Sequence, residues 1–234
     1  MKRITPQLAA SIEAESFQLL RDLQDSLAGV LKSLDGKRGA NLFECFLFHT
    51  SAYVNRTAEG FVALRQTGRI DASKLLVRPA MEAMFKQQAV LRQPELLYRM
   101  AYTERLEDRK LIEPVYHRAG KNYDNLDCRQ WEQFKKEYAK QYPNHTKAET
   151  KLSLYDAAKA AKIERYYESY YRLYCQTTHA AFRAATGGLK FTDVEDNRTM
   201  ALCVLGALDA LERSRISNVP GLSDFRQRLS NLPG

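Results

Sequence analysis

Apolar residues recur at mixed three- and four-residue steps along most of the chain, which is the spacing of one face of an α-helix. The first such stretch covers residues 6–34, where Thr5 is placed to cap a helix and Pro6 would occupy its first position. A second stretch covers residues 40–67 and is followed by Gly68, which suits a helix C-terminus. The pattern therefore predicts two long helices at the start of the chain.

A third stretch, residues 72–92, is apolar almost all round, and such a helix is usually central in a bundle. Asp71 is expected to cap it, and Pro79 is expected to kink it or to mark its true start. Charges of both signs alternate along residues 94–119, which indicates a helix with a solvent-facing side, and Pro114 is placed to bend it.

The same periodicity predicts four later helices, over residues 127–142, 152–161, 164–187 and 193–215. No stretch reads as a convincing strand. The sequence therefore predicts an all-α fold, a single-domain helical bundle of about eight or nine helices over residues 1–234. Its four-helix core is expected to comprise residues 40–67, 72–92, 164–187 and 193–215. Residues 94–162 are expected to form a peripheral helical excursion against that core.

The composition agrees with a globular helical domain. The chain has 234 residues, of which 44% are hydrophobic, and its 11 glycines and 7 prolines are too few for an all-β fold with many tight turns. No apolar run approaches the roughly 18–20 residues of a membrane-spanning helix, and the N-terminus has no apolar signal core. We therefore expect a cytoplasmic protein that does not enter a membrane.

The four cysteines form no CxxC pair and are expected to be reduced thiols: Cys45, Cys128, Cys175 and Cys203. His49 follows one of them, and His179 another, at a distance of four residues, so two packed helices would present a Cys2His2 set to a metal. The alternative is that His49 lies in the core. The chain has no P-loop, GxGxxG or HExxH motif, and we expect neither a cofactor nor a metal.

The helix predicted over residues 164–187 carries the arrangement that looks most suited to chemistry. Arg172 and His179 fall on a polar stripe beside a stripe of tyrosines. One interpretation is a bundle helix with its aromatic face inward and its arginines in water. The other places Arg172 and His179 side by side in a cleft.

A second polar pair interrupts the apolar third helix. Arg78 and Glu82 lie four residues apart on one face, in the order that favours a helical ion pair less. Two charges on a central helix need partners or water. They form either an ion pair that ties this helix to a neighbour, or a site in which Glu82 meets His179 across the bundle and orients it or shares its proton.

The spacing of Arg172 and His179, Arg-x6-His, resembles the Arg-x4–6-His motif of HEPN-type helical ribonucleases, in which the pair acts at a dimer seam. The resemblance implies a homodimer in which His179 is a general acid/base for cleavage by the RNA's own 2′-hydroxyl group. Arg172 would hold the phosphate and offset its growing charge. Histidine titrates near neutrality and arginine binds phosphate in a bidentate way, so both residue types suit these roles.

A wider resemblance covers residues 58–91 and 170–182. These segments resemble a bacterial family of unknown function, the DUF5677 type, and its DUF6988-like relatives. The matching positions are Leu64, Gly68, Asp71, Ala72, Leu75 or Leu76, Arg78, Glu82, Ala83, Tyr171 and His179. The resemblance implies an all-helical fold and draws attention to Arg78, Glu82 and His179, but it implies no established activity. Helical proteins of this sort are found among phage-defence or toxin genes, which suggests a partner protein from a neighbouring gene.

Three function hypotheses stay open. The first is a HEPN-like, metal-independent ribonuclease or RNA-directed toxin, with His179 as the acid/base, Arg172 as the phosphate holder, and Arg78 and Glu82 in support. The net charge of +8 permits such an acidic partner. The second is a non-catalytic helical adaptor or regulatory protein. The third is a protein that binds a small anionic ligand between Arg78 and Arg172.

Overall fold

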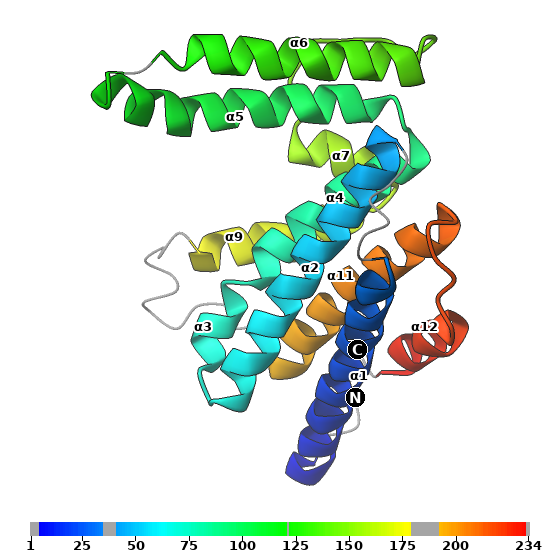
Figure 1. The fold of residues 1–234 in the computed structure, drawn as a ribbon. Helices are drawn as coiled ribbons and strands as arrows, with labels where there is room; N and C mark the ends of the chain where they lie inside the picture. The colour runs from blue at the N-terminus through cyan, green and yellow to red at the C-terminus, as the bar shows by residue number, and fades with distance from the viewer. Residues whose placement is uncertain (1–4, 35–40, 121, 179–191, 233–234) are drawn as a thin grey trace.

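The computed structural model describes residues 5–34, 41–120, 122–178 and 192–232, and within these ranges the secondary structure is entirely helical (Figure 1). The helices are α1 (Pro6–Ser33), α2 (Leu42–Gln66), α3 (Ile70–Lys74), α4 (Val77–Arg92), α5 (Leu96–Arg118), α6 (Asp124–Gln141), α7 (Leu154–Ala160), α8 (Glu164–Tyr166), the π-helix η1 (Tyr167–Tyr171), α9 (Arg172–Thr178), α11 (Asp193–Arg213) and α12 (Leu222–Asn231). The all-α class predicted from periodicity is confirmed. None of these described helices is long and apolar enough to cross a membrane.

Local signals in the sequence set several helix ends. The Thr5 hydroxyl accepts a hydrogen bond from the Leu8 N–H at 3.3 Å, as expected for the cap of α1. Gly68 follows α2 with φ at +74°, a conformation that glycine adopts without strain. Pro79 lies in the first turn of α4, so it marks the start of that helix and does not kink it. The prediction that Asp71 caps this segment was wrong, because the cap position of α3 is Arg69.

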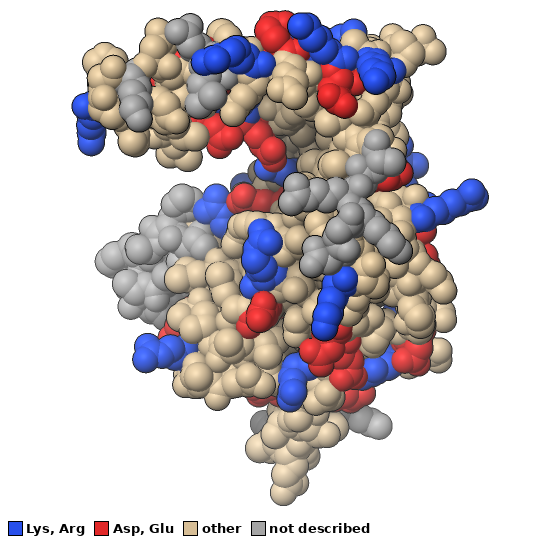
Figure 2. All heavy atoms as spheres, in the orientation of Figure 1, with Lys and Arg blue, Asp and Glu red and all other residues tan. Residues whose placement is uncertain are grey.

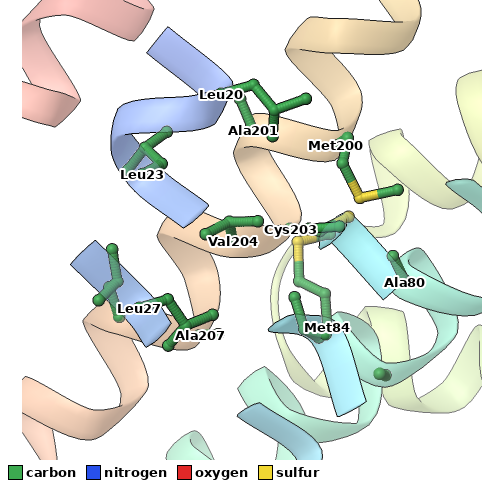
Figure 3. Packing of buried hydrophobic residues seen from close by; sticks show 14 of the residues in the cluster. Leu20, Leu23, Leu27, Ala80, Met84, Met200, Ala201, Cys203, Val204 and Ala207 are labelled. Carbon is green, nitrogen blue, oxygen red and sulfur yellow. The ribbon is translucent and has the colours of Figure 1, made fainter. Parts of the chain in front are cut away.

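The main core lies between α1, α2, α4 and α11, whose buried faces form one continuous hydrophobic cluster. Figure 3 shows leucines of α1, Met84 of α4 and small apolar residues of α11 directed into a common space. Leu20, Leu23 and Leu27 are completely buried there, and each such side chain stabilises the fold by about 1.5–3 kcal/mol through removal from water. The bundle therefore holds α4, and with it the Arg78–Glu82 pair, in a fixed position.

The membership of this core differs from the prediction. The fourth helix is α1, which presents a long unbroken stripe of leucines. The described part of the tyrosine-rich segment, residues 164–178, is divided among α8, η1 and α9, and Figure 1 shows α9 lying across α4. It contributes Tyr171 and Tyr174 to the edge of the cluster. Two bulky phenol groups need polar partners when buried, which favours the edge of a bundle over its centre.

A second hydrophobic cluster forms where α5, α6 and α7 meet the end of α4. Its centre is aromatic: the ring of Tyr98 lies 5.3 Å from that of Trp131 and 5.1 Å from that of Tyr138. Figure 1 shows α5 and α6 as an antiparallel pair that extends across one end of the bundle. The segment predicted as an excursion thus forms a layer of its own, and α7 lies between that layer and the bundle.

Candidate functional site

The Arg78–Glu82 ion pair is present on α4, with the Arg78 Nε atom 2.9 Å from the Glu82 Oε1 atom. Both side chains are partly exposed, at 27% and 33%. A third residue completes the group, because the Tyr171 hydroxyl donates a hydrogen bond of 2.8 Å to the same Glu82 oxygen. The Arg78 guanidinium also lies over the Tyr171 ring, 5.8 Å from its centroid. Tyr171 therefore joins the third predicted helix to the tyrosine-rich segment.

The π-helix η1 positions Tyr171. The ring of Tyr171 stacks on that of Tyr167 at a centroid distance of 4.9 Å, and it meets the ring of Phe85 of α4 edge-on at 5.8 Å. A π-turn accommodates an extra residue in the helix and is frequent at functional sites. It also changes the angular register of everything that follows, so the face that Arg172 presents cannot be read from a uniform helical wheel.

A pocket of about 280 Å³ opens beside this group. Its lining comes from α4, α5, η1, α7 and the two residues before α7: Arg78, Glu82, Lys86, Met100, Thr103, Glu104, Leu152, Ser153, Leu154, Ala157 and Tyr171. The Lys86 ammonium pairs with Glu104 across the pocket at 3.1 Å. Two cations and two carboxylates therefore line the pocket in two pairs, together with three hydroxyl side chains, those of Thr103, Ser153 and Tyr171.

The protonation states of Arg78 and Tyr171 are firmly set. Burial acts to lower the pKa of Arg78, but its hydrogen bonds with Glu82 and Tyr171 outweigh this and raise the pKa, so the guanidinium stays charged. Burial, followed by hydrogen bonds with Cys175 and Glu82, raises the pKa of Tyr171 far above its ordinary value. Tyr171 is therefore a permanent donor, and it holds the Glu82 carboxylate in place.

The structure does not bring Arg172 into this pocket. Its side chain is exposed, as are those of Arg165 and Glu168, whereas Tyr171 and Tyr174 are buried. Over its described part the helix thus turns its tyrosines inward and its arginines to water, as the first of the two interpretations expected. His179 lies outside the described residues, so its predicted meetings with Arg172 and with Glu82 stay predictions.

A buried carboxylate that the sequence reasoning missed anchors the same helix. Asp196 of α11 accepts a hydrogen bond of 2.6 Å from the Tyr174 hydroxyl, and its other oxygen lies 2.9 Å from Arg65 Nη2 and 3.7 Å from Lys74 Nζ. Burial raises the pKa of Asp196 to about 6, although the hydroxyl and the two cations act to lower it. The sequence did contain one indication that Asp196 is buried: it lies four residues before Met200, on the same apolar face of the helix.

The metal hypothesis has limited support among the described residues. In that part of the chain no group of three or more His, Cys, Asp or Glu side chains is arranged to hold a metal ion. His49 is exposed, so the alternative that placed it in the core was wrong. Cys45 and Cys175 are half-buried and neither forms a disulfide. The Cys2His2 set also requires His179, which is outside the described residues.

The view in Figure 2 shows a hollow between the α5–α6 layer and the bundle. Acidic and basic side chains are interspersed around it, and this face carries no extended patch of one sign. The net charge of +8 is therefore not concentrated there. This face therefore has no broad positive field that would attract an acidic partner.

One comparison with known proteins gives a match. The chain matches the model of a family described as "Family of unknown function (DUF5677)" over residues 44–198, which is more than half of its length. No curated protein and no solved structure matches it. The matched range contains the whole Arg78–Glu82–Tyr171 group, and the resemblance noted in the sequence is confirmed. The chain therefore belongs to the DUF5677 family, whose function is unknown.

Proposed function

We propose that this protein is an RNA-directed, metal-independent ribonuclease of the HEPN-like type, and that the pocket beside Arg78 holds a phosphate of the RNA. The observation that carries the proposal is the hydrogen bond from Tyr171 to Glu82. It links the Arg78–Glu82 pair to the tyrosine-rich segment, which contains Arg172 and precedes His179 in the sequence. Two distant segments that suggested chemistry are thereby joined at one pocket.

The pocket has the side chains that a phosphate needs. A guanidinium has five N–H donors, so Arg78 can bind Glu82 and a phosphate oxygen together. Lys86 supplies a second charge. Its pair with Glu104 is half-exposed, and such pairs contribute only about 0–1 kcal/mol. A phosphate can therefore displace Glu104 from Lys86 at little cost.

The proposed reaction uses the RNA itself as the nucleophile. The 2′-oxygen attacks the adjacent phosphorus, the bond to the 5′-oxygen breaks, and the products are a 2′,3′-cyclic phosphate and a 5′-hydroxyl. His179 takes the 2′-hydroxyl proton and a proton is returned to the leaving oxygen. Arg172 offsets the charge that develops on the scissile phosphate, which is not the phosphate held beside Arg78, because Arg172 does not line that pocket. Arg78 and Glu82 position the strand.

Purified protein incubated with end-labelled single-stranded RNA in EDTA tests the proposal. We expect products that end in a 2′,3′-cyclic phosphate, and a loss of roughly 10²–10⁴-fold in rate for His179→Ala without a change in melting temperature. Arg172→Ala should also lose activity. Arg165→Ala, which removes an exposed arginine seven residues earlier in the chain, is the matched control and should not. Wild-type protein that neither cleaves nor binds any RNA at low salt would refute the proposal.

Binding of a small anionic ligand is the second candidate. Its support is the two cations in the pocket lining, Arg78 and Lys86. The volume of about 280 Å³ lies just below the range of roughly 300–1,000 Å³ typical of ligand sites and so suits only a small ligand. Arg172 does not line the pocket. In this case inorganic phosphate or a nucleoside monophosphate should raise the melting temperature of the wild type but not of Arg78→Met. If neither RNA nor phosphate binds, the result favours the adaptor hypothesis, in which Arg78, Glu82 and Tyr171 have only a structural role.

Self-association and location are further parts of the proposal. Leu111 and Val115 lie one helical turn apart on α5 and are exposed at 73% and 61%. Two large apolar side chains on one solvent-facing helix surface favour coverage by another protein, and a second copy of this chain is our first candidate. A partner protein from a neighbouring gene is the other candidate.

The four cysteines form no disulfide, which supports a cytoplasmic location.

A further inference from the structure

An exposed tyrosine, Tyr155, is connected through the ring of Tyr167 to Tyr171, which lines the pocket beside Arg78. Tyr155 is the second residue of α7, and it directly follows Ser153 and Leu154, which line the pocket. Its side chain is 39% exposed although it is large and aromatic. An exposed ring next to phosphate-binding side chains is the arrangement with which proteins hold single-stranded nucleic acids.

The ring of Tyr155 is held in place by a row of aromatic rings that leads to the core. It meets the ring of Tyr167 edge-on at 5.4 Å, and Tyr167 stacks on Tyr171 at 4.9 Å. Tyr171 in turn contacts the buried Phe85 at 5.8 Å. The row of four rings runs from the core to the surface. Tyr155 is therefore braced in one orientation, and a base that stacks on it loses less energy to ordering the protein.

We infer that Tyr155 is a stacking platform for one base of a single-stranded RNA whose adjacent phosphate lies between Arg78 and Lys86. This inference rests on the proposed function and specifies its substrate class. Inside a duplex, both faces of a base are stacked on the adjacent bases, so a duplex base cannot stack on Tyr155. A single strand can be splayed out so that base and phosphate bind together.

Stacking predicts a particular pattern of affinities. Tyr155→Ala should weaken binding of a single strand by about 5- to 150-fold, the change that ~1–3 kcal/mol per stacked base corresponds to. Tyr155→Phe should bind as the wild type does, because the ring is retained. Tyr53 of α2 is exposed to a similar extent, at 43%, and Tyr53→Ala is the matched control that should have no effect.

The salt dependence separates the ring from the charges. Tyr155→Ala should leave the slope of log affinity against log salt unchanged, because it removes no phosphate contact. Lys86→Met should reduce that slope by about 0.7, the value for one contact with a single strand. Both variants change partly exposed side chains, and circular dichroism should show unchanged helix content.

The experiment is a fluorescence anisotropy titration at several salt concentrations. The probe is a labelled 2′-O-methyl oligonucleotide of about 12 residues, which lacks the attacking hydroxyl and so stays intact. A duplex of the same length should bind far more weakly. Binding that depends on Lys86 but is unchanged in Tyr155→Ala, or equally reduced in Tyr155→Phe, overturns the stacking inference and leaves the proposed function standing. Wild-type protein that binds no oligonucleotide at low salt overturns both.

Discussion

Replacing Asp196 by asparagine is expected to destabilise the protein strongly, although the two side chains have the same shape. Asp196 is completely buried, and its carboxylate faces Arg65, Lys74 and the hydroxyl of Tyr174. The variant leaves Arg65, whose side chain is only 6% exposed, with less negative charge around it. It also removes one of the contacts that hold α9 against α11.

The magnitude follows from the geometry. Removing one partner of a buried ion pair costs about 3–5 kcal/mol when the other charge is left uncompensated. Arg65 keeps a second partner, Asp193 at 2.8 Å, so we expect the lower limit, about 3 kcal/mol. For a chain of this length that corresponds to a fall of roughly 6–12 °C in melting temperature. It is also a large part of the ~5–15 kcal/mol typical of a domain.

Urea unfolding followed by circular dichroism at pH 7 measures this loss. Lys110→Met, which removes an exposed pair with Glu107, is the control and should have no measurable effect. Replacing the buried pair together, as Arg65→Met with Asp196→Leu, should recover part of the stability because the Arg65 charge is removed with its partner, whereas Lys74, 14% exposed, still loses Asp196. A loss below about 1 kcal/mol for Asp196→Asn would refute the assignment of this pair as a structural anchor.

Three further predictions concern pH, association and helix stability. Because burial raises the pKa of Asp196 from 3.8 to about 6, folding binds a proton between these two values. Protonation therefore adds stability as the pH falls from ~6 to ~4, beyond what the ionised carboxylate contributes at pH 7, and this increment is lost as the pH rises through ~6. The stability of the wild type minus that of Asp196→Asn should therefore increase between pH 7 and pH 4 in urea titrations, and a flat difference would contradict the raised pKa. Leu111→Lys should convert a dimer to a monomer in light scattering at micromolar concentration. Leu75→Lys, which changes a leucine that is 48% exposed but lies outside α5, is the control and should leave the dimer intact. A wild type that is monomeric throughout would contradict the association. Gly29 lies within α1, and an added Cβ would meet nothing within 4 Å, so Gly29→Ala should add about 0.5–1 kcal/mol in urea unfolding. The same change at Gly206 places the Cβ 3.2 Å from a methionine side chain of α4 and should gain less; equal gains would show that this contact costs nothing.

Much of the local structure was predictable because it depends on neighbours in the sequence. The spacing of apolar residues predicted most of the long described helices to within a few residues, but not the division of residues 70–92 into α3 and α4 or the helix α12. Thr5 and Gly68 were correctly placed at helix ends. These features arise from contacts within one or two turns. The pairing of Arg78 with Glu82 was also accessible, since residues four apart on a helix are neighbours.

Other parts of the candidate site were not predictable from periodicity. A helical wheel at 100° per residue assumes a uniform helix, and the π-turn at η1 breaks that assumption between Tyr167 and Tyr171. The partners of Asp196 lie on three other helices, and no local pattern indicates which helices meet. The same limit explains why α1 was not recognised as a core helix.

The sequence by itself determined the all-helical class, most helix boundaries and the residues able to carry chemistry, because these follow from side-chain type and from spacing along one helix. Only the tertiary structure decided that Tyr171 closes on Glu82, that Arg172 faces water and that Tyr155 stands exposed beside the pocket. Those outcomes depend on how helices distant in sequence pack together. Packing is selected by the burial of whole faces at once, and no single segment contains that information.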